Sequence, residues 1–250
     1  FVNGGGFSGG DRGGPLHINF CQSLASLGYH AASISYPLLQ KDQGFGCDVS
    51  ESRKLYNFQV VGQHINRARN YYAINYNKFR VDTNKIILIG SSAGAEAVLH
   101  AAYWPACLVD NIKSEYAGLI SMAGAINSLS YIRRDNIIPM LLFHGTCDDL
   151  VPFGTAPHHY CDKDAPGYLM LHGSAAIADH AKKLGSQFYL FMECGGGHEW
   201  SSRPFEYGFG NIVDFIEKDI IQQQSRQIRH VEYKDKTCEQ YPRSSYCDDN

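Results

Sequence analysis

Apolar and polar positions along this 250-residue chain follow two periods in turn, one typical of helices and one typical of buried strands. Between residues 58 and 72, apolar residues recur at spacings of three and four, which predicts a long helix with one buried stripe. Residues 85–90 form a short continuous apolar run, as in a strand covered on both faces. The same reasoning predicts further strands at 29–36, 117–122, 139–144 and 187–192, and further helices at 15–27, 93–103, 175–184 and 205–222. This alternation predicts an α/β fold with a mostly parallel central sheet and helices on both faces.

The alternating pattern occupies residues 1–222, which we interpret as one domain, and residues 223–250 are polar and predict a C-terminal tail. With 44% hydrophobic and 19% charged residues, the chain can bury a core. A net charge of −3 with scattered Lys and Arg argues against nucleic acid as a partner. No apolar run approaches the roughly 20 residues that a membrane span needs.

Eight cysteines are many for a reduced cytosolic protein, and none of them forms a CxxC pair. We therefore expect an oxidising compartment and a secreted or periplasmic protein. Spacing alone suggests two disulfides, Cys147 with Cys161 around a proline-containing loop and Cys238 with Cys247 in the tail. The alternative is that some cysteines are small buried thiols. The candidates for that role are Cys21, Cys107 and Cys194.

The most informative segment is Gly-Ser-Ser-Ala-Gly at residues 90–94, between a predicted buried strand and a predicted helix. In that context Gly-x-Ser-x-Gly is typical of a nucleophile elbow. Glycine is needed at positions 90 and 94 because the strand and helix backbones crowd the turn. Ser92 would then expose its Oγ at the start of the helix. The alternative, a Gly/Ser turn without chemistry, is disfavoured by the strand and helix that flank it.

A serine hydroxyl attacks only when a base takes its proton and a third group orients that base. Asp148 follows the predicted strand at 139–144, and His198 follows the last predicted strand in a glycine-rich loop. Both lie where open α/β sheets bind ligands, at the carboxyl ends of strands. The order therefore predicts Ser92 as nucleophile, Asp148 as acid and His198 as base. Asp149 is the alternative acid, because spacing does not separate neighbouring residues.

A second group of polar residues, His158 and His159 with Asp162 and Asp164 nearby, suggests a metal site as an alternative. Adjacent histidines in an extended segment usually point in opposite directions. A solvated loop explains them at least as well, so we predict no metal.

The beginning of the chain reads Asn-Gly-Gly-Gly-Phe at residues 3–7. Consecutive glycines allow backbone N–H groups to turn toward a developing oxyanion. We predict that the amides of Gly5 and Gly6, with that of Ala93, form an oxyanion hole. On its own a glycine run is more often a flexible turn, but the elbow favours the functional interpretation.

Together these residues resemble the α/β-hydrolase superfamily, in particular its esterase and lipase branch with a HGGGF-type oxyanion loop. The resemblance extends from Asn3 to about residue 222 and implies the α/β-hydrolase fold. It also implies hydrolysis through an acyl-enzyme, with no metal or organic cofactor. The family pattern puts the acid at Asp148, after His144 and Gly145. Asn3 stands where many relatives have His, and the family's early strands would precede Phe1.

Substrate size follows from the connections between strands. About 16 residues separate the predicted strands at 117–122 and 139–144, too few for a helical cap domain. We therefore expect no large cap and an open site, with residues 150–173 as one wall. Such a site suits short acyl esters or ester groups of polysaccharides. The alternatives are a serine peptidase of the prolyl-peptidase type and a catalytically silent binding module on the same fold.

Overall fold

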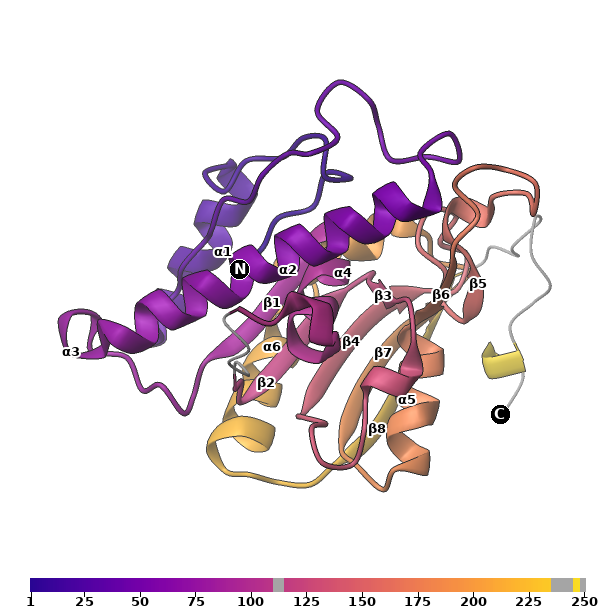
Figure 1. Cartoon of the computed structure of the whole chain (residues 1–250). Helices are drawn as coiled ribbons and strands as arrows, with labels where there is room; N and C mark the ends of the chain where they lie inside the picture. Colours follow the sequence, from indigo (N-terminus) through magenta and orange to yellow (C-terminus); the bar gives the residue numbers. More distant parts are fainter. Residues whose placement is uncertain (110–114, 235–244, 248–250) are drawn as a thin grey trace.

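A central parallel sheet organises the computed structural model, which describes residues 1–109, 115–234 and 245–247 (Figure 1). Its five strands lie in the order β1-β2-β4-β7-β8, and every neighbouring pair is parallel. The strands are β1 (Ile87–Ser91), β2 (Gly118–Met122), β4 (Met140–Gly145), β7 (Phe188–Cys194) and β8 (Gln227–Tyr233). Beyond β1, Val2 forms single parallel bridges with Ile34 and Gly90, so the start of the chain lies alongside the sheet.

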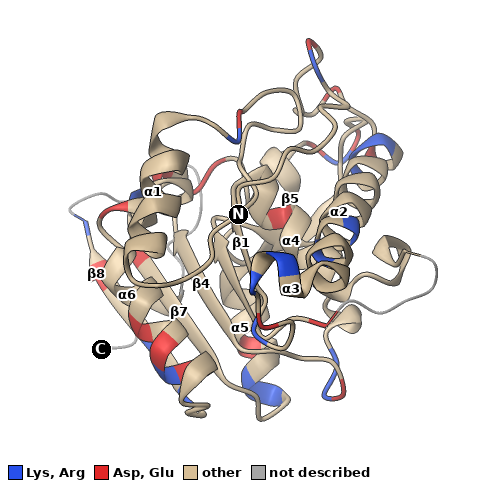
Figure 2. Ribbon diagram, turned by 90° about the vertical axis from the view of Figure 1, so that its left-hand side faces the viewer, with Lys and Arg blue, Asp and Glu red and all other residues tan. Residues whose placement is uncertain are grey.

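Helices cover both faces of this sheet, as Figure 2 shows from the side. One face carries α1 (Pro15–Ser26) and α6 (Phe209–Phe215), which continues as a π-helical turn at Ile216–Ile221. The other face carries α2 (Glu51–Ile74), α4 (Ala93–Tyr103) and α5 (Ser174–Lys183), and the short α3 (Tyr76–Phe79) follows α2. No helix in the described part of the chain is long and apolar enough to cross a membrane.

Alternate side chains of each strand enter two separate core layers, because successive residues of a strand point to opposite faces. Leu119 packs in the layer under α2, α4 and α5, whereas Ile120 packs in the layer under α1 and α6. Leu142 and Phe143 of β4 divide in the same way. Apolar residues at consecutive strand positions are thus explained by burial on both faces, as the sequence predicted.

A small antiparallel sheet lies apart from the central one, with the order β3-β6-β5. Its strands are β3 (Ala125–Ile126), β5 (Thr155–Pro157) and β6 (Met170–Gly173). Short 3-10 helices occur at Pro105–Cys107, Leu129–Tyr131, His158–Tyr160, His198–Ser201, Arg203–Phe205 and Ser245–Cys247. Between β2 and β4 the chain forms only β3 and one 3-10 turn, so no helical cap is inserted there.

The predicted fold class is confirmed, but two predicted segments differ. Residues 29–36 were predicted as a strand, but within the described part of the chain their one β-bridge joins Ile34 to Val2, and the Ile34 amide donates to the Phe1 carbonyl oxygen. Residues 227–233, assigned to the polar tail, are instead β8 at the edge of the sheet. An edge strand has one neighbour and an exposed side, which explains its polar composition.

Both disulfide pairings predicted from spacing are wrong. Cys161 is bonded to Cys47, 114 residues away, and Cys247 is bonded to Cys194. Cys147 is also disulfide-bonded, whereas Cys238 lies outside the described residues. Of the cysteines interpreted as buried thiols, two are free, namely Cys21 and Cys107. Proximity along the chain failed as a guide because the fold brings distant loops together at the end of the sheet.

Candidate active site

The segment that connects β1 to α4 is a tight turn that holds Ser92 in a strained conformation. Ser92 has φ 51° and ψ −123°, in a region that residues with a side chain rarely adopt. The two flanking glycines are required by space: a Cβ on Gly90 would lie 2.3 Å from the Gly94 carbonyl oxygen. A Cβ on Gly94 would lie 2.2 Å from the carbonyl oxygen of Val2. Strain held by close packing of this kind is typical of a nucleophile elbow.

The structure brings the three predicted catalytic side chains into one hydrogen-bonded chain. Ser92 Oγ lies 2.8 Å from His198 Nε2, and His198 Nδ1 lies 2.7 Å from Asp148 Oδ2. These contacts fit a neutral imidazole whose Nδ1–H donates to the carboxylate and whose Nε2 accepts from the serine. The His198 side chain is partly exposed, whereas the Asp148 side chain is fully buried.

Asp148 is an ionised carboxylate whose acceptor positions are satisfied. The amides of Leu150 and Val151 donate to its Oδ1 at 3.0 and 2.9 Å. Burial alone would raise the pKa of Asp148, but hydrogen bonds from His144 and His198 hold that pKa well below its ordinary value. Asp149, the alternative acid, is exposed, whereas Asp148 is the residue in contact with His198.

His144 is a second histidine on Asp148, and sequence reasoning placed it only as a strand-end residue. It is fully buried, and its Nε2 lies 3.0 Å from the Val151 carbonyl oxygen and 3.3 Å from Asp148 Oδ2. Its Nδ1 lies 2.8 Å from Ser174 Oγ. The Ser174 hydroxyl can donate to His144 Nδ1, which leaves the imidazole proton on Nε2, directed at Asp148 and the Val151 carbonyl oxygen. The sequence feature that could have identified His144 is its position at the start of the His-Gly-Thr-Cys-Asp segment, which ends at Asp148.

The glycine-rich loop at the start of the chain lies directly against the elbow. A Cβ on Gly4 would be 2.9 Å from Ser92 Cβ, so this backbone approaches the nucleophile more closely than a side chain would allow. Gly5 and Gly6 have φ 119° and 57°, conformations that favour glycine. Ala93 is the first residue of α4, so its N–H has no acceptor within the helix. Gly4 was not singled out from the sequence, although it belongs to the same glycine run.

Two residues that flank the glycines hold this loop. Asn3 is buried, and its Nδ2 donates to the Gly4 carbonyl oxygen at 2.8 Å. The Tyr36 hydroxyl donates to the Asn3 carbonyl oxygen at 2.9 Å. Phe7 is fully buried and makes an edge contact with Phe45 at 4.8 Å between ring centroids. The loop is therefore anchored at both ends in spite of its glycine content.

Beside the triad lies a second buried polar group, formed by Lys54, Glu96 and His158. Glu96 is on α4, one turn after the nucleophile, and its amide donates to the Ser92 carbonyl oxygen. Its Oε1 lies 3.3 Å from His158 Nε2 without the alignment of a hydrogen bond. Burial raises the pKa of Glu96 to about 8 and lowers the pKa of His158 well below its ordinary value. Burial therefore disfavours the charged form of both groups in this contact.

Lys54 supplies the positive charge of that group and is fully buried. Its Nζ donates to the Gly167 carbonyl oxygen at 2.8 Å and lies over the Phe45 ring. Burial lowers its pKa to about 8. His159 has a left-handed backbone conformation, with φ 55°, and its ring makes an edge contact with that of His158 at 4.3 Å between centroids. Among the described residues, no group of three or more His, Cys, Asp or Glu is arranged to hold a metal ion.

Comparison with known proteins supports the fold. No protein-family model and no curated protein sequence matches the chain. Among solved structures, a thermophilic esterase from the planctomycete Thermogutta terrifontis with bound propionate matches at a TM-score of 0.62 and 18% identity, covering 87% of this chain and 81% of that one. Its butyrate-bound structure matches at 0.63, with the same identity and coverage. An α/β hydrolase from a Medee basin deep-sea metagenome library matches at 0.53 and 14% identity, covering 88% and 84%.

These likenesses extend over most of the chain. Since the identities are below 20%, they establish architecture rather than substrate. Together with the five-stranded parallel sheet and its covering helices, they show that the chain has the α/β-hydrolase fold.

Proposed function

We propose that this protein is a serine carboxylic-ester hydrolase that acts through an acyl-enzyme. The observation that carries the proposal is the continuous chain from Ser92 through His198 to Asp148, with contacts of 2.8 and 2.7 Å. The esterases among the structural neighbours support the same reaction class.

In the first half of the reaction, Ser92 Oγ attacks the ester carbonyl carbon while its proton moves to His198 Nε2. Asp148 stabilises the imidazolium through the hydrogen bond to Nδ1. The tetrahedral intermediate then breaks its bond to the alcohol oxygen, and His198 returns the proton to the leaving alcohol. The product of this half is an ester of Ser92 with the acyl group.

In the second half, a water molecule gives a proton to His198 Nε2 and attacks the acyl carbonyl carbon. Collapse of this second intermediate returns the proton to Ser92 and releases the carboxylic acid. Both halves place negative charge on the same carbonyl oxygen. We assign its stabilisation to the amides of Gly5, Gly6 and Ala93, and we add Gly4, because its backbone lies against Ser92. Loss of one such donor typically costs about 2.7–4 kcal/mol.

We infer that the substrates are short acyl esters or ester groups of polysaccharides. No helical cap is inserted between β2 and β4, which supports an open site. The esterase neighbour has been observed with propionate and with butyrate, which are short acyl groups. The Cys47–Cys161 disulfide fastens the segment that follows the catalytic acid, so this wall is stiff. Disulfides also support an oxidising location, secreted or periplasmic.

Hydrolysis of p-nitrophenyl acetate, butyrate and octanoate tests the proposal, with Ser92→Ala as the matched variant and Ser26→Ala, at an exposed serine of α1, as the control. We expect the wild type to cleave the acetate and butyrate fastest. Ser92→Ala reduces kcat by about a million-fold, to the background that binding alone provides. Full activity in a folded Ser92→Ala protein would overturn the assignment.

A further inference from the structure

Backbone hydrogen bonds to Glu193 connect the loop that carries His198 to the loop that carries Asp148. We call these segments the base loop (residues 195–201) and the acid loop (residues 145–151). The Glu193 carbonyl oxygen accepts from the amides of Thr146 and Gly196 at 3.0 and 3.1 Å. Cys147 N donates to the Gly196 carbonyl oxygen at 2.7 Å. Glu193 therefore lies where the acid loop and the base loop meet, at the end of β7.

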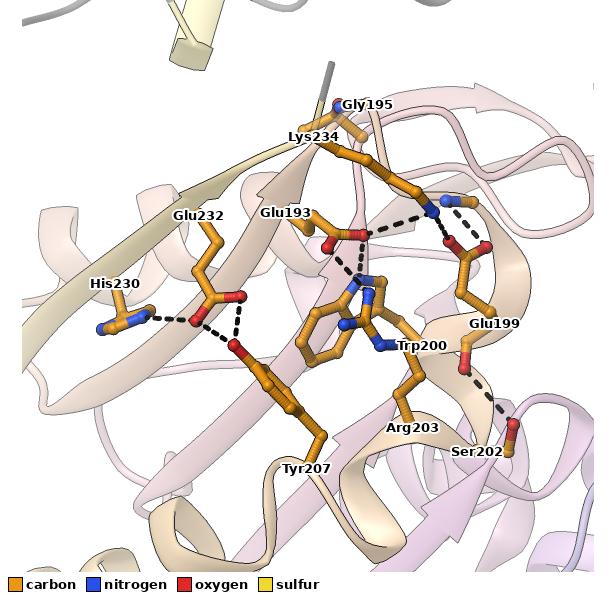
Figure 3. Close-up of polar contacts among 12 residues, drawn as sticks. Glu193, Gly195, Glu199, Trp200, Ser202, Arg203, Tyr207, His230, Glu232 and Lys234 are labelled. Atoms are coloured by element: carbon orange, nitrogen blue, oxygen red, sulfur yellow. Dashed lines mark hydrogen bonds and ion pairs between the residues drawn. The ribbon is translucent and has the colours of Figure 1, made fainter. Parts of the chain in front are cut away.

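The side chain of Glu193 reaches the other end of the base loop. Its carboxylate is buried, and Trp200 Nε1 donates to Oε2 at 3.0 Å (Figure 3). Arg203 Nη1 donates to Oε1 at 2.7 Å, and the guanidinium lies 4.8 Å from the centre of the Trp200 ring. The Gly196 backbone packs directly against this carboxylate, since a Cβ there would lie 2.4 Å from Glu193 Oε2. His198 is thus enclosed between two segments that are bonded to the same residue.

Three further hydrogen bonds restrain the residues around His198. The Glu199 carboxylate accepts from the amide of Gly197 at 3.0 Å and from Lys234 Nζ at 2.7 Å. Ser91 Oγ donates to the Ser201 carbonyl oxygen at 2.7 Å, which ties the end of the base loop to the residue before the nucleophile. The base loop is consequently held by the acid loop, by Glu193 and by the elbow.

We propose that Glu193 is a positioning residue that sets the place of His198 relative to Ser92 and Asp148, acting through Trp200. This inference rests on the proposed function and adds a residue outside the triad to it. The carboxylate does not touch the reacting atoms. Its effect comes from fixing the chain on both sides of the imidazole, and displacement of a catalytic group by about 1 Å can cost about 100-fold in rate.

A double-mutant cycle tests this coupling. Glu193→Gln removes the charge but keeps the shape, and Trp200→Phe removes the Nε1–H donor from a fully buried ring. We expect each variant to lower kcat on p-nitrophenyl acetate by about 10-fold to 100-fold, with KM within about 2-fold. Because both changes weaken or remove the hydrogen bond between Trp200 and Glu193, we expect the loss of kcat in the double variant to be smaller than the product of the two single losses.

Glu232→Gln is the matched control. Glu232 belongs to the same polar cluster, where Tyr207 donates to it and His230 lies 3.3 Å away (Figure 3). We expect this variant to keep wild-type kcat. The melting temperature of all variants is measured in parallel, so that a loss of stability is distinguished from a loss of positioning.

A second readout needs no substrate. The Nδ1–H proton shared between His198 and Asp148 should give a low-field proton resonance that is lost in Asp148→Asn. We expect Glu193→Gln and Trp200→Phe to broaden or remove this resonance, and Glu232→Gln to retain it. If Glu193→Gln lowers only the melting temperature and leaves kcat and the resonance unchanged, the positioning role is refuted. If the wild type lacks Ser92-dependent hydrolysis, the proposed function fails, and the resonance alone decides whether Glu193 positions the imidazole.

Discussion

Two buried carboxylates close to Ser92 differ in the number of donors that surround them. Asp148 accepts from two backbone amides and from His198, and His144 Nε2 lies 3.3 Å away. Glu96 is equally buried, but its Oε1 has no hydrogen-bond partner. The pKa of Asp148 is held low, whereas burial raises the pKa of Glu96 to about 8. Donors, rather than burial, decide which carboxylate carries a charge at neutral pH.

This difference assigns the two groups different tasks. An ionised Asp148 can stabilise the imidazolium that forms during catalysis. A protonated Glu96 carries no charge into the interior behind the nucleophile and leaves Lys54 and Asp148 as the charges of that region. We therefore expect substitutions of Asp148 to change the rate and substitutions of Glu96 to change the stability.

The largest effect is expected at the acid. Asp148→Asn removes the charge and favours the wrong imidazole tautomer, so kcat should fall by about 10,000-fold while the fold persists. Asp149→Asn is the control, because that side chain is exposed, and its kcat should remain near that of the wild type. Steady-state kinetics on p-nitrophenyl butyrate measures both. The reverse order would move the acid by one residue.

The next largest effect is expected from removal of the disulfide between Cys47 and Cys161. This disulfide holds the segment that packs His158 against Glu96. Replacing both cysteines with serine should lower the free energy of unfolding by about 2–4 kcal/mol. If the disulfide keeps water away from Glu96, the same variant should lower the pKa of that carboxyl. Denaturant unfolding of the wild type and the variant measures the change in the free energy of unfolding. An unchanged free energy would show that this disulfide does not stabilise the fold. Cys21→Ser, which removes a free thiol, is the control.

A change in the pH dependence of stability is expected for Glu96→Gln. Between the unfolded pKa, about 4.3, and the folded value, about 8, the folded protein retains a proton that the unfolded chain has released. Raising the pH through this window therefore destabilises the wild type by up to about 1.4 kcal/mol per pH unit relative to the variant. Unfolding free energies at pH 5.5 and pH 7.5 measure the slope. Equal slopes in the two proteins would show that Glu96 is ionised.

Asp148 should show the opposite sign. Its folded pKa lies below its unfolded value, so its contribution to stability is present above the unfolded pKa, about 3.9, and is lost as the pH falls through the folded pKa. The two carboxylates thus contribute slopes of opposite direction in separate pH ranges.

The parallel sheet and the elbow could be predicted because their signals are local. Continuous apolar runs indicate strands covered on both faces, and the glycines at 90 and 94 are demanded by a single turn. The fold also brings Ser92, Asp148 and His198 together in the predicted order. These features depend on a few neighbouring residues, which a sequence displays directly.

Features that depend on distant contacts could not be predicted. The partner of Cys161 is Cys47, which spacing does not indicate. β8 has a polar composition, and only its pairing with β7 identifies it as part of the sheet. Glu193 has no motif of its own, because its place between two loops exists only in the folded chain.

The proposed function requires Ser92 to be the nucleophile that forms the acyl-enzyme. Incubation with a fluorophosphonate, followed by intact-mass and peptide-mass measurement, tests this requirement. We predict one covalent adduct per chain, located on Ser92, with loss of p-nitrophenyl butyrate hydrolysis in proportion to labelling and no adduct in Ser92→Ala. Hydrolysis that survives complete labelling of Ser92, or an adduct on another residue that accounts for the lost activity, would show that Ser92 is not the nucleophile.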